Sequence, residues 1–358
     1  SGSNDANVQK IVIAINRLLG NFGHTFDTSR RLLTKQGSDL EFTELLERME
    51  NGRVGAVLFN NANPGYDYHD SERLTTALSN VDLKVSFSGF PNETMTHCDY
   101  ILPDFHFLES WNDFEPRRGI YSISQPGIHH IFDSRQMQDS LLVWTGSTIN
   151  FSEYLRQYWE KELYPRFSGY PDFETFRIEL LQKGCMEYDV PEDSIRYATN
   201  ISDIRLDEPD DDVFELQLTV PIGLSSPYHS NNPWLQELPD PVSRVTWENY
   251  ASISPKYARE KGIETGDIIV VAGMELPALV QPGQAYGVLS IALNYGRTGA
   301  GKVAEDIGSN VYPFAVMQNG NVQYYRKVDE PALTGKRTTL ALTQTHHTLE
   351  GREIVRET

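Results

Sequence analysis

Three observations predict an α/β domain followed by a mostly β domain. Short apolar strands alternate with amphipathic helices over residues 1–145, a pattern typical of a partial doubly wound parallel sheet covered on both faces. Over residues 213–358, strand-like segments are separated by Gly and Pro turns, which favours a mostly antiparallel β-barrel. The 358 residues are too many for one small domain, and we expect a connecting segment over residues 146–212.

The α/β domain is expected to begin with two amphipathic helices. Apolar residues recur at helical spacing over residues 8–19, and Gly20 ends this first helix. Ser38 and Glu41 have the spacing of a capping box, which predicts the start of the second helix. The second helix is expected to carry its apolar side chains inward and to end before Gly52.

Two apolar strands are expected in this domain, at residues 56–59 and 83–87, with a helix capped by Asp70 between them. A further extended segment lies at residues 100–103. The loops that follow these segments cover residues 60–65, 88–90 and 103–109. Because the carboxyl ends of parallel strands meet at one edge of a sheet, we expect the loops to line the edge where open α/β sheets bind ligands.

The connecting segment is rich in Pro and aromatic residues. Its apolar spacing predicts helices near residues 154–159 and 173–181. The acidic stretch over residues 207–212 is interpreted as a solvated linker, and a calcium site there is the alternative.

Six strand-like segments define the β domain. They cover residues 214–220, 268–271, 278–281, 288–293, 314–317 and 338–343. Ser254 and Pro255 predict the start of a short helix that Gly262 ends. Gly266 and Asp267 then turn the chain into the next strand.

The composition disfavours several classes of protein. A net charge of −19, from 50 Asp and Glu against 31 Lys and Arg, argues against a nucleic-acid partner, because counterion release needs clustered cations. Cys98 and Cys185 are the only cysteines, so this chain alone cannot build a cysteine zinc site or an iron–sulfur cluster. No run of about 18 apolar residues occurs, so we expect no direct membrane insertion. The start at Ser1, without an export signal, indicates an excised piece of a longer chain or a trimmed mature chain.

A polar loop over residues 224–239 is the first candidate for a binding site. It is dense in small hydroxyl and amide side chains and carries one large aromatic residue, Trp234. This composition is typical of a surface that hydrogen-bonds a flat polar ligand. An ordered loop with a purely structural role has the same composition and stays the alternative.

Five motifs in order resemble the molybdopterin oxidoreductase superfamily, specifically the C-terminal half of its large subunit. They are LLGNFG at residues 18–23, NNANP at 60–64, ETMTHCDYILP at 93–103, the residues 125–126 with 133–135, and SPKYAREKGIETGD at 254–267. The resemblance runs from about residue 8 to residue 320. It implies C-terminal domains like those of formate dehydrogenase and DMSO reductase, the second being a double-psi barrel.

Two narrower resemblances bear on function. Residues 232–239 and 110–113 look like the polysulfide and thiosulfate reductase branch. Residues 340–352 look closest to the large iron–sulfur subunit of alternative complex III, the quinol:cytochrome c oxidoreductase. In that subunit a molybdopterin-enzyme-like half lacks the molybdenum cofactor, which would make this chain a cofactor-less scaffold.

The second resemblance also implies partners and a location. We expect iron–sulfur clusters on another domain of the same polypeptide, together with haem and membrane subunits of a respiratory complex. The assembly is expected on the periplasmic side of the cytoplasmic membrane. The alternative is a fragment of a true enzyme that holds molybdopterin guanine dinucleotide and reduces polysulfide, thiosulfate or a similar oxyanion.

The resemblance implies a vestigial or occupied site for pterin nucleotides. The matching positions are Asn60, Asn63, Ser225, Ser226, His229, Asn231, Asn232, Trp234, Asn294, Arg297, Thr298 and Asn310. Residues 223–227 depart from the family's TGRxxxHxxT phosphate loop and offer no cation, which leaves Arg297 and Lys302 nearest to balance phosphate charge. We therefore favour an empty site, without catalytic residues or a metal in this fragment.

Other clusters of reactive side chains are interpreted as structural. His97, Cys98, Asp99 and His106 have the residue types of a metal site, but Asp99 matches a structural Asp of the family. The pairs at residues 129–130 and 346–347 are adjacent histidines, which point to opposite faces in a strand. No Ser-His-Asp or Cys-His arrangement can be assigned.

Overall fold

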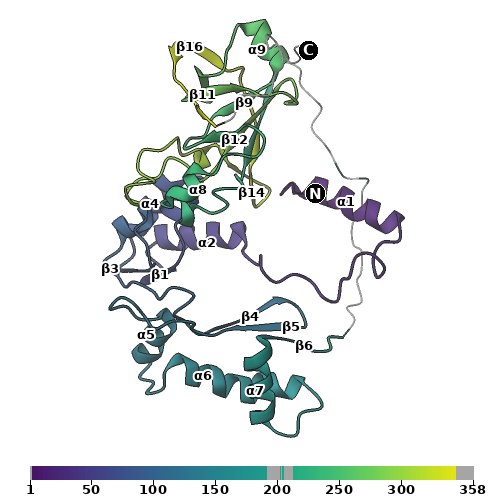
Figure 1. Ribbon diagram of the computed structural model, residues 1–358, viewed down its shortest axis with the longest axis vertical. Coiled ribbons are helices and arrows are strands. Elements are labelled where there is room, and N and C mark those ends of the chain that lie inside the picture. The colour runs from purple at the N-terminus through teal and green to yellow at the C-terminus, as the bar shows by residue number, and fades with distance from the viewer. Residues whose placement is uncertain (1, 192–201, 203, 205–212, 344–358) are drawn as a thin grey trace, which may run out of the picture.

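The computed structural model describes residues 2–191, 202, 204 and 213–343, so the acidic stretch at 207–212 and the histidines at 346–347 lie outside the described residues. Its helices are α1 Ala6–Leu18, α2 Asp39–Glu50, α3 Pro64–Asp67, α4 Ser71–Leu78, α5 Met137–Trp144, α6 Phe151–Tyr158, α7 Phe173–Lys183, α8 Pro233–Glu237 and α9 Pro255–Lys261. Figure 1 shows three parts stacked along the long axis of the molecule, with the C-terminal strands at the top and α6 and α7 at the bottom.

The strands form several separate sheets. They are β1 Ala56–Asn60, β2 Leu83–Phe87, β3 Tyr100–Ile101, β4 Asn112–Arg117, β5 Ile120–Ser124, β6 Cys185–Glu187, β7 Phe214–Thr219, β8 Val245–Thr246, β9 Ala251–Ile253, β10 Asp267–Val271, β11 Met274–Val280, β12 Val288–Ala292, β13 Val316–Gln318, β14 Asn321–Gln323, β15 Tyr325–Val328, β16 Ala332–Arg337 and β17 Ala341–Leu342. Below, β1–β3 with α2 and α4 are called the α/β layer, and β4–β6 with α6 and α7 the hairpin unit. The elements from β7 onward are called the barrel domain, after the barrel that the sequence predicts for them.

The α/β layer contains the expected parallel strands. β1, β2 and β3 pair in parallel in that order. The side chains of Val57 and Phe59 pack against α2 and α4, whose starts are capped by Ser38 and Asp70 as predicted. The opposite face is covered only in part: the ring of Phe87 meets that of Trp144 in α5, whereas Leu58 is 46% exposed. The expectation that helices cover both faces is therefore wrong for much of the sheet, because this short sheet has few helices around it.

The hairpin unit was not predicted. β4 and β5 form an antiparallel hairpin around Gly119. The third strand, β6, belongs to the segment 146–212 that was expected to connect the two domains, and it pairs with β5. Trp159 and Phe176 lie in its apolar core, so the two helices expected in the connecting segment do form. Pro116 lies inside β4, where a proline argues against a strand, and this hides the hairpin from the sequence pattern.

The barrel domain is built on a seven-stranded mixed sheet in the order β15-β7-β12-β9-β11-β10-β16. The β7–β12 and β9–β11 pairs are parallel, and the other pairs of this sheet are antiparallel. Helix α9 begins at the Ser254 cap and ends at Gly262 as expected. The last two predicted strands are misplaced: a 3-10 turn at Tyr312–Phe314 precedes β13, because Pro313 starts a helical turn readily, and the segment at 338–343 contains only the two residues of β17.

Helix α1 forms at the predicted position, capped by the carboxylate of Asp5, but none of its residues is buried. In Figure 1 it lies to one side, apart from the α/β layer. Its last residue, Leu18, and the C-cap residue Leu19 are both exposed. No helix in the described part of the chain has the length and apolar character needed to cross a membrane.

Candidate functional site

A cleft of about 530 Å³ lies where the loops after β1 and β2 face residues 226–234 of the barrel domain. Parallel pairing places these two loops at the same edge of the sheet, as the sequence predicts. Among the predicted site residues, seven line the cleft: Asn63, Ser226, His229, Asn231, Asn232, Trp234 and Arg297. The other five, Asn60, Ser225, Asn294, Thr298 and Asn310, do not line it.

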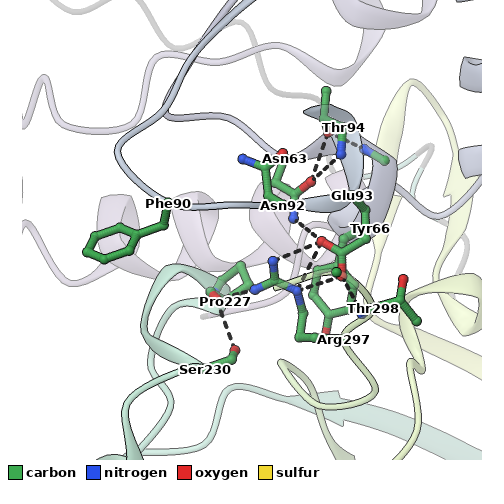
Figure 2. Close-up of polar contacts among 12 residues, drawn as sticks. Asn63, Tyr66, Phe90, Asn92, Glu93, Thr94, Pro227, Ser230, Arg297 and Thr298 are labelled. Carbon is green, nitrogen blue, oxygen red and sulfur yellow. Dashed lines mark hydrogen bonds and ion pairs between the residues drawn. The ribbon is translucent and has the colours of Figure 1, made fainter. Parts of the chain in front are cut away.

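A buried ion pair joins the two sides of the cleft. Arg297 donates from Nε to Oε1 of Glu93 at 2.8 Å and from Nη2 to Oε2 at 2.8 Å (Figure 2). The side chains of Arg297 and Glu93 are only 5% and 12% exposed. Arg297 also donates to the carbonyl of Pro227, and its guanidinium lies 4.6 Å from the ring centroid of Tyr66. Arg297, which the sequence analysis considered as a partner for phosphate, is therefore already paired with a carboxylate of the protein itself.

Glu93 was recognised in a motif but not as a site residue. It begins a 3-10 turn, Glu93–His97, that Asn92 caps. Burial acts to raise its pKa, but hydrogen bonds from Arg297, from Asn63 and from the backbone of Thr298 prevail and hold the pKa below its ordinary value. The carboxylate is thus ionised at neutral pH and matches the positive charge of Arg297.

The predicted amides mostly serve the architecture of the loops. Asn63 donates to Glu93 and accepts from the hydroxyl of Thr94, which fastens the loop after β1 to the 3-10 turn (Figure 2). The Oδ1 atom of Asn231 accepts from the backbone of Val303, and that of Asn232 caps α8. The side chain of Asn63 and the Oδ1 atoms of Asn231 and Asn232 therefore hold the loops of the cleft in place.

The predicted residues outside the cleft have structural contacts or are exposed. Asn294 is buried; its Nδ2 donates to the carbonyl of Leu224 at 2.5 Å and its Oδ1 accepts from Tyr312. Asn310 donates to the carbonyl of Tyr66 at 3.3 Å. Asn60 and Ser225 are exposed, as is Lys302, which does not line the cleft.

Aromatic side chains form one wall of the cleft. The rings of Phe90 and Tyr228 meet edge to face, with 5.1 Å between their centroids. Trp234, on the short helix α8, is 80% exposed. The imidazoles of His106 and His229 also line the cleft. The wall therefore offers flat, electron-rich surfaces.

Asp67 is the residue that sequence reasoning missed. It ends α3, directly after the buried Tyr66, and lines both this cleft and a cavity of about 190 Å³ behind it. Within the described residues, its carboxylate receives no hydrogen bond from another side chain and no ion pair within 4.0 Å. Burial raises its pKa to about 6, against an ordinary value of 3.8. Only its position after the Asn-Pro turn was visible in the sequence.

Replacing Asp67 by Asn is expected to stabilise the protein at pH 8 by about 1–3 kcal/mol. The folded state holds the proton of Asp67 more tightly than the unfolded chain, so this residue's favourable contribution is complete below pH 3.8 and is lost as the pH rises through about 6. The stabilisation should therefore vanish near pH 4. Urea unfolding at the two pH values tests this, with Glu44→Gln, an exposed carboxylate on α2, as the control. Equal stability of Asp67→Asn and the parent at pH 8 would contradict it.

The metal cluster considered in the sequence does not form. No group of three or more His, Cys, Asp or Glu side chains in the described residues is placed to hold a metal ion. Cys98 donates to the carbonyl of Thr94, and burial raises its pKa to about 11. Asp99 accepts from the backbone of Lys84 at 2.8 Å and thus has the structural role expected for it.

Comparison with known proteins places this arrangement in a class. No family model matches the chain. Its fold is similar to acetylene hydratase from Pelobacter acetylenicus, with a TM-score of 0.57 over 81% of this chain and 46% of that one, at 15% identity. The fold of this chain is thus similar to less than half of a longer protein.

Two known proteins are similar to this chain in sequence. The chain is 30% identical over 95 residues to the menaquinone reductase, molybdopterin-binding-like subunit of Nitratidesulfovibrio vulgaris, and 23% identical over 303 residues to the thiosulfate reductase molybdopterin-containing subunit of Salmonella typhimurium. The matches cover 25% and 70% of this chain, but only 14% and 39% of those relatives. These similarities in sequence support a molybdopterin oxidoreductase family for the chain, which spans less than half the length of either relative.

Proposed function

We propose that this chain is part of a molybdopterin oxidoreductase-like large subunit that lacks the molybdenum cofactor and serves as a scaffold in a respiratory quinol:acceptor oxidoreductase of the alternative complex III type. One observation carries the proposal: Glu93 neutralises Arg297, the one Lys or Arg among the described residues that line the cleft. A cleft without a free cation is unsuited to a pyrophosphate.

The residues of the cleft do not fit a pterin dinucleotide. Its pyrophosphate bears several negative charges, which proteins usually balance with arginine, lysine or a nest of backbone N–H groups. Here the guanidinium is bound on two edges, and the carboxylate of Asp67 adds a negative charge. The backbone N–H of Thr298, which could serve an anion, already donates to Glu93. No chemical step through the cofactor is therefore assigned to these residues.

The name of one relative supports the same assignment. The Nitratidesulfovibrio protein is described as molybdopterin-binding-like and belongs to a menaquinone reductase. For this chain we propose iron–sulfur clusters on another domain of the same polypeptide, and haem and membrane subunits as partners. We place the complex on the periplasmic side of the cytoplasmic membrane and the barrel domain in the double-psi class.

A second function has support of its own. The longer of the two similarities is to a molybdopterin-containing subunit of thiosulfate reductase. On this alternative the chain is a fragment of a true enzyme for polysulfide, thiosulfate or a similar oxyanion. The cleft would then hold molybdopterin guanine dinucleotide, and the Glu93–Arg297 pair would have to open to free a cation.

Metal and pterin analysis of the natively purified full-length protein distinguishes the two functions. The scaffold predicts iron in stoichiometric amounts with molybdenum and pterin far below one per chain. Stoichiometric molybdenum with guanine nucleotide would overturn the scaffold and establish the enzyme.

The fragment by itself is expected to show no turnover with quinols, thiosulfate or polysulfide. Its two cysteines, Cys98 and Cys185, cannot hold an iron–sulfur cluster. Spectrophotometric assays with a reduced quinol and an artificial acceptor test this. Reproducible turnover by the fragment would contradict the assignment.

A further inference from the structure

The charge of the cleft is reversed relative to a phosphate site. Glu93 and the carbonyl of Pro227 occupy the donor edges of Arg297. The carboxylate of Asp67 lies in the same cleft without a cation of its own. Among the described residues that line the cleft, Asp67 and Arg297 carry charge, together with any protonated histidine. Because Glu93, which does not line the cleft, already pairs with Arg297, the carboxylate of Asp67 is left unmatched, and a cation is the ligand that would balance it.

The wall of the cleft favours an organic cation over an inorganic one. The rings of Phe90, Tyr228 and Trp234 line the same space as the carboxylate, and all three are substantially exposed. Aromatic faces attract ammonium and, more often, guanidinium groups, and arginine stacks on them because its head group is flat. A metal ion, in contrast, needs several oxygen, nitrogen or sulfur ligands, and the described residues offer no such group here.

The cost of an unpaired carboxylate points to a ligand as well. Burial disfavours the charged form of Asp67, so we expect this residue to lower the stability of the folded protein at neutral pH. Residues that lower the stability of the folded protein are often found at binding sites, where contacts with the bound ligand compensate for the lost stability. A volume of about 530 Å³ lies within the range of small-molecule pockets and has room for a guanidinium group.

We propose that the cleft binds a guanidinium group, whose N–H donors pair with the carboxylate of Asp67 and whose flat face stacks on the aromatic wall of Phe90, Tyr228 and Trp234. This inference rests on the cofactor-less cleft of the proposed function. The group belongs to a free small molecule or to an arginine side chain of a protein partner. Both share the same chemistry, and the experiment separates them.

The test is a calorimetric titration of the full-length protein at pH 8. The probes are N-acetyl-arginine methylamide, agmatine, N-acetyl-citrulline methylamide and guanosine diphosphate. Citrulline has nearly the shape of arginine without the charge, so we expect it to bind at least about tenfold more weakly than the arginine derivative. Tighter binding of agmatine assigns the site to a free small molecule, and tighter binding of the arginine derivative assigns it to a protein side chain; either result supports the proposal.

Two variants link the binding to this cleft. Asp67→Asn, which is expected to fold with increased stability, should weaken binding of the guanidinium probe at least about tenfold, and Trp234→Ala should weaken it less. Glu44→Gln, on the exposed face of α2, should leave it unchanged. Unchanged affinity in Asp67→Asn would overturn the proposal.

Binding should also weaken between pH 8 and pH 5. The groups that face Asp67 are the ion pair of Glu93 and Arg297, the phenols of Tyr66, Tyr312 and Tyr324 and, along the smaller cavity, Asp39 and His69. His106 and His229 line the cleft too and could also change the affinity with pH. The loss of affinity between pH 8 and pH 5 is therefore assigned to Asp67 only if the Asp67→Asn variant no longer shows it.

The possible failures are distinguishable. If no guanidinium probe binds and guanosine diphosphate does not bind either, this inference falls while the cofactor-less scaffold stands. Saturable binding of guanosine diphosphate, tighter than that of the arginine derivative, would overturn both.

Discussion

Replacing Glu93 by Gln is expected to lower the free energy of unfolding by about 3–5 kcal/mol. The substitution leaves the guanidinium of Arg297, only 5% exposed, without its counter-charge. Removing one partner of a buried ion pair costs more than the pair itself contributes, since the remaining charge cannot regain its hydration. Urea unfolding at pH 8, followed by circular dichroism, measures the change.

Two further variants show whether the effect belongs to the buried charge. The double variant Glu93→Gln/Arg297→Met removes both charges and should be less destabilised than Glu93→Gln alone. Glu275→Gln breaks an exposed ion pair with Lys336 and should cost under about 1 kcal/mol. If Glu93→Gln lowered the free energy of unfolding no more than Glu275→Gln, the Glu93–Arg297 ion pair would not be what stabilises the contact between the two sides of the cleft.

The pH dependence of this pair has a defined sign. The pKa of Glu93 is lowered in the folded protein, so its contribution to stability is present above the ordinary value of 4.5 and is lost as the pH falls below it. The parent and Glu93→Gln should therefore converge in stability in acid. This direction is opposite to that of Asp67.

Replacing Tyr66 by Ala is expected to cost about 3–5 kcal/mol and to separate the unfolding of the α/β layer from that of the barrel domain. Tyr66 comes from α3 but lies in the apolar core of the barrel domain, with its ring edge to face against Tyr312. Its hydroxyl donates to the carbonyl of Tyr295 at 2.5 Å. Scanning calorimetry should show two transitions in the variant where the parent shows one.

The conservative variant Tyr66→Phe keeps the ring and removes only the hydroxyl. It should cost about 1–2 kcal/mol, because the carbonyl of Tyr295 loses its donor, and should leave a single transition. A single transition in Tyr66→Ala would show that other contacts suffice to dock the two parts, such as the hydrogen bond from the backbone of Val322 to Asp39.

The local signals in the sequence predicted much of the fold. Helix starts at Ser38, Asp70 and Ser254 follow from capping chemistry, which depends on neighbours three residues away. The parallel pairing of β1 with β2 follows from the alternation of strands and helices. The β4–β5 hairpin could not be predicted, because Pro116 contradicts a strand locally and the partner β6 is distant in the sequence.

The site was predicted in outline and not in its chemistry. The loops that approach each other follow from strand ends, whereas the state of Arg297 depends on Glu93, which is 204 positions away. Propensities and short motifs carry no information on such a pair. The importance of Asp67 was also hidden, because a carboxylate after a turn is usually solvated, whereas the folded protein buries this one next to Tyr66.

Helix α3 is a single turn that places the side chains of Tyr66 and Asp67 in different surroundings. Tyr66 reaches into the barrel domain, and Asp67 lines the cleft beside it. Because the cleft exists only while the α/β layer and the barrel domain are docked, occupancy of the cleft and docking share one free energy of coupling. Contacts that stabilise the docking of the α/β layer on the barrel domain therefore raise the affinity of the cleft for its ligand. By the same factor, a bound ligand stabilises the docked arrangement. Helix α3 would in this way couple occupancy of the cleft to the docking of the two parts.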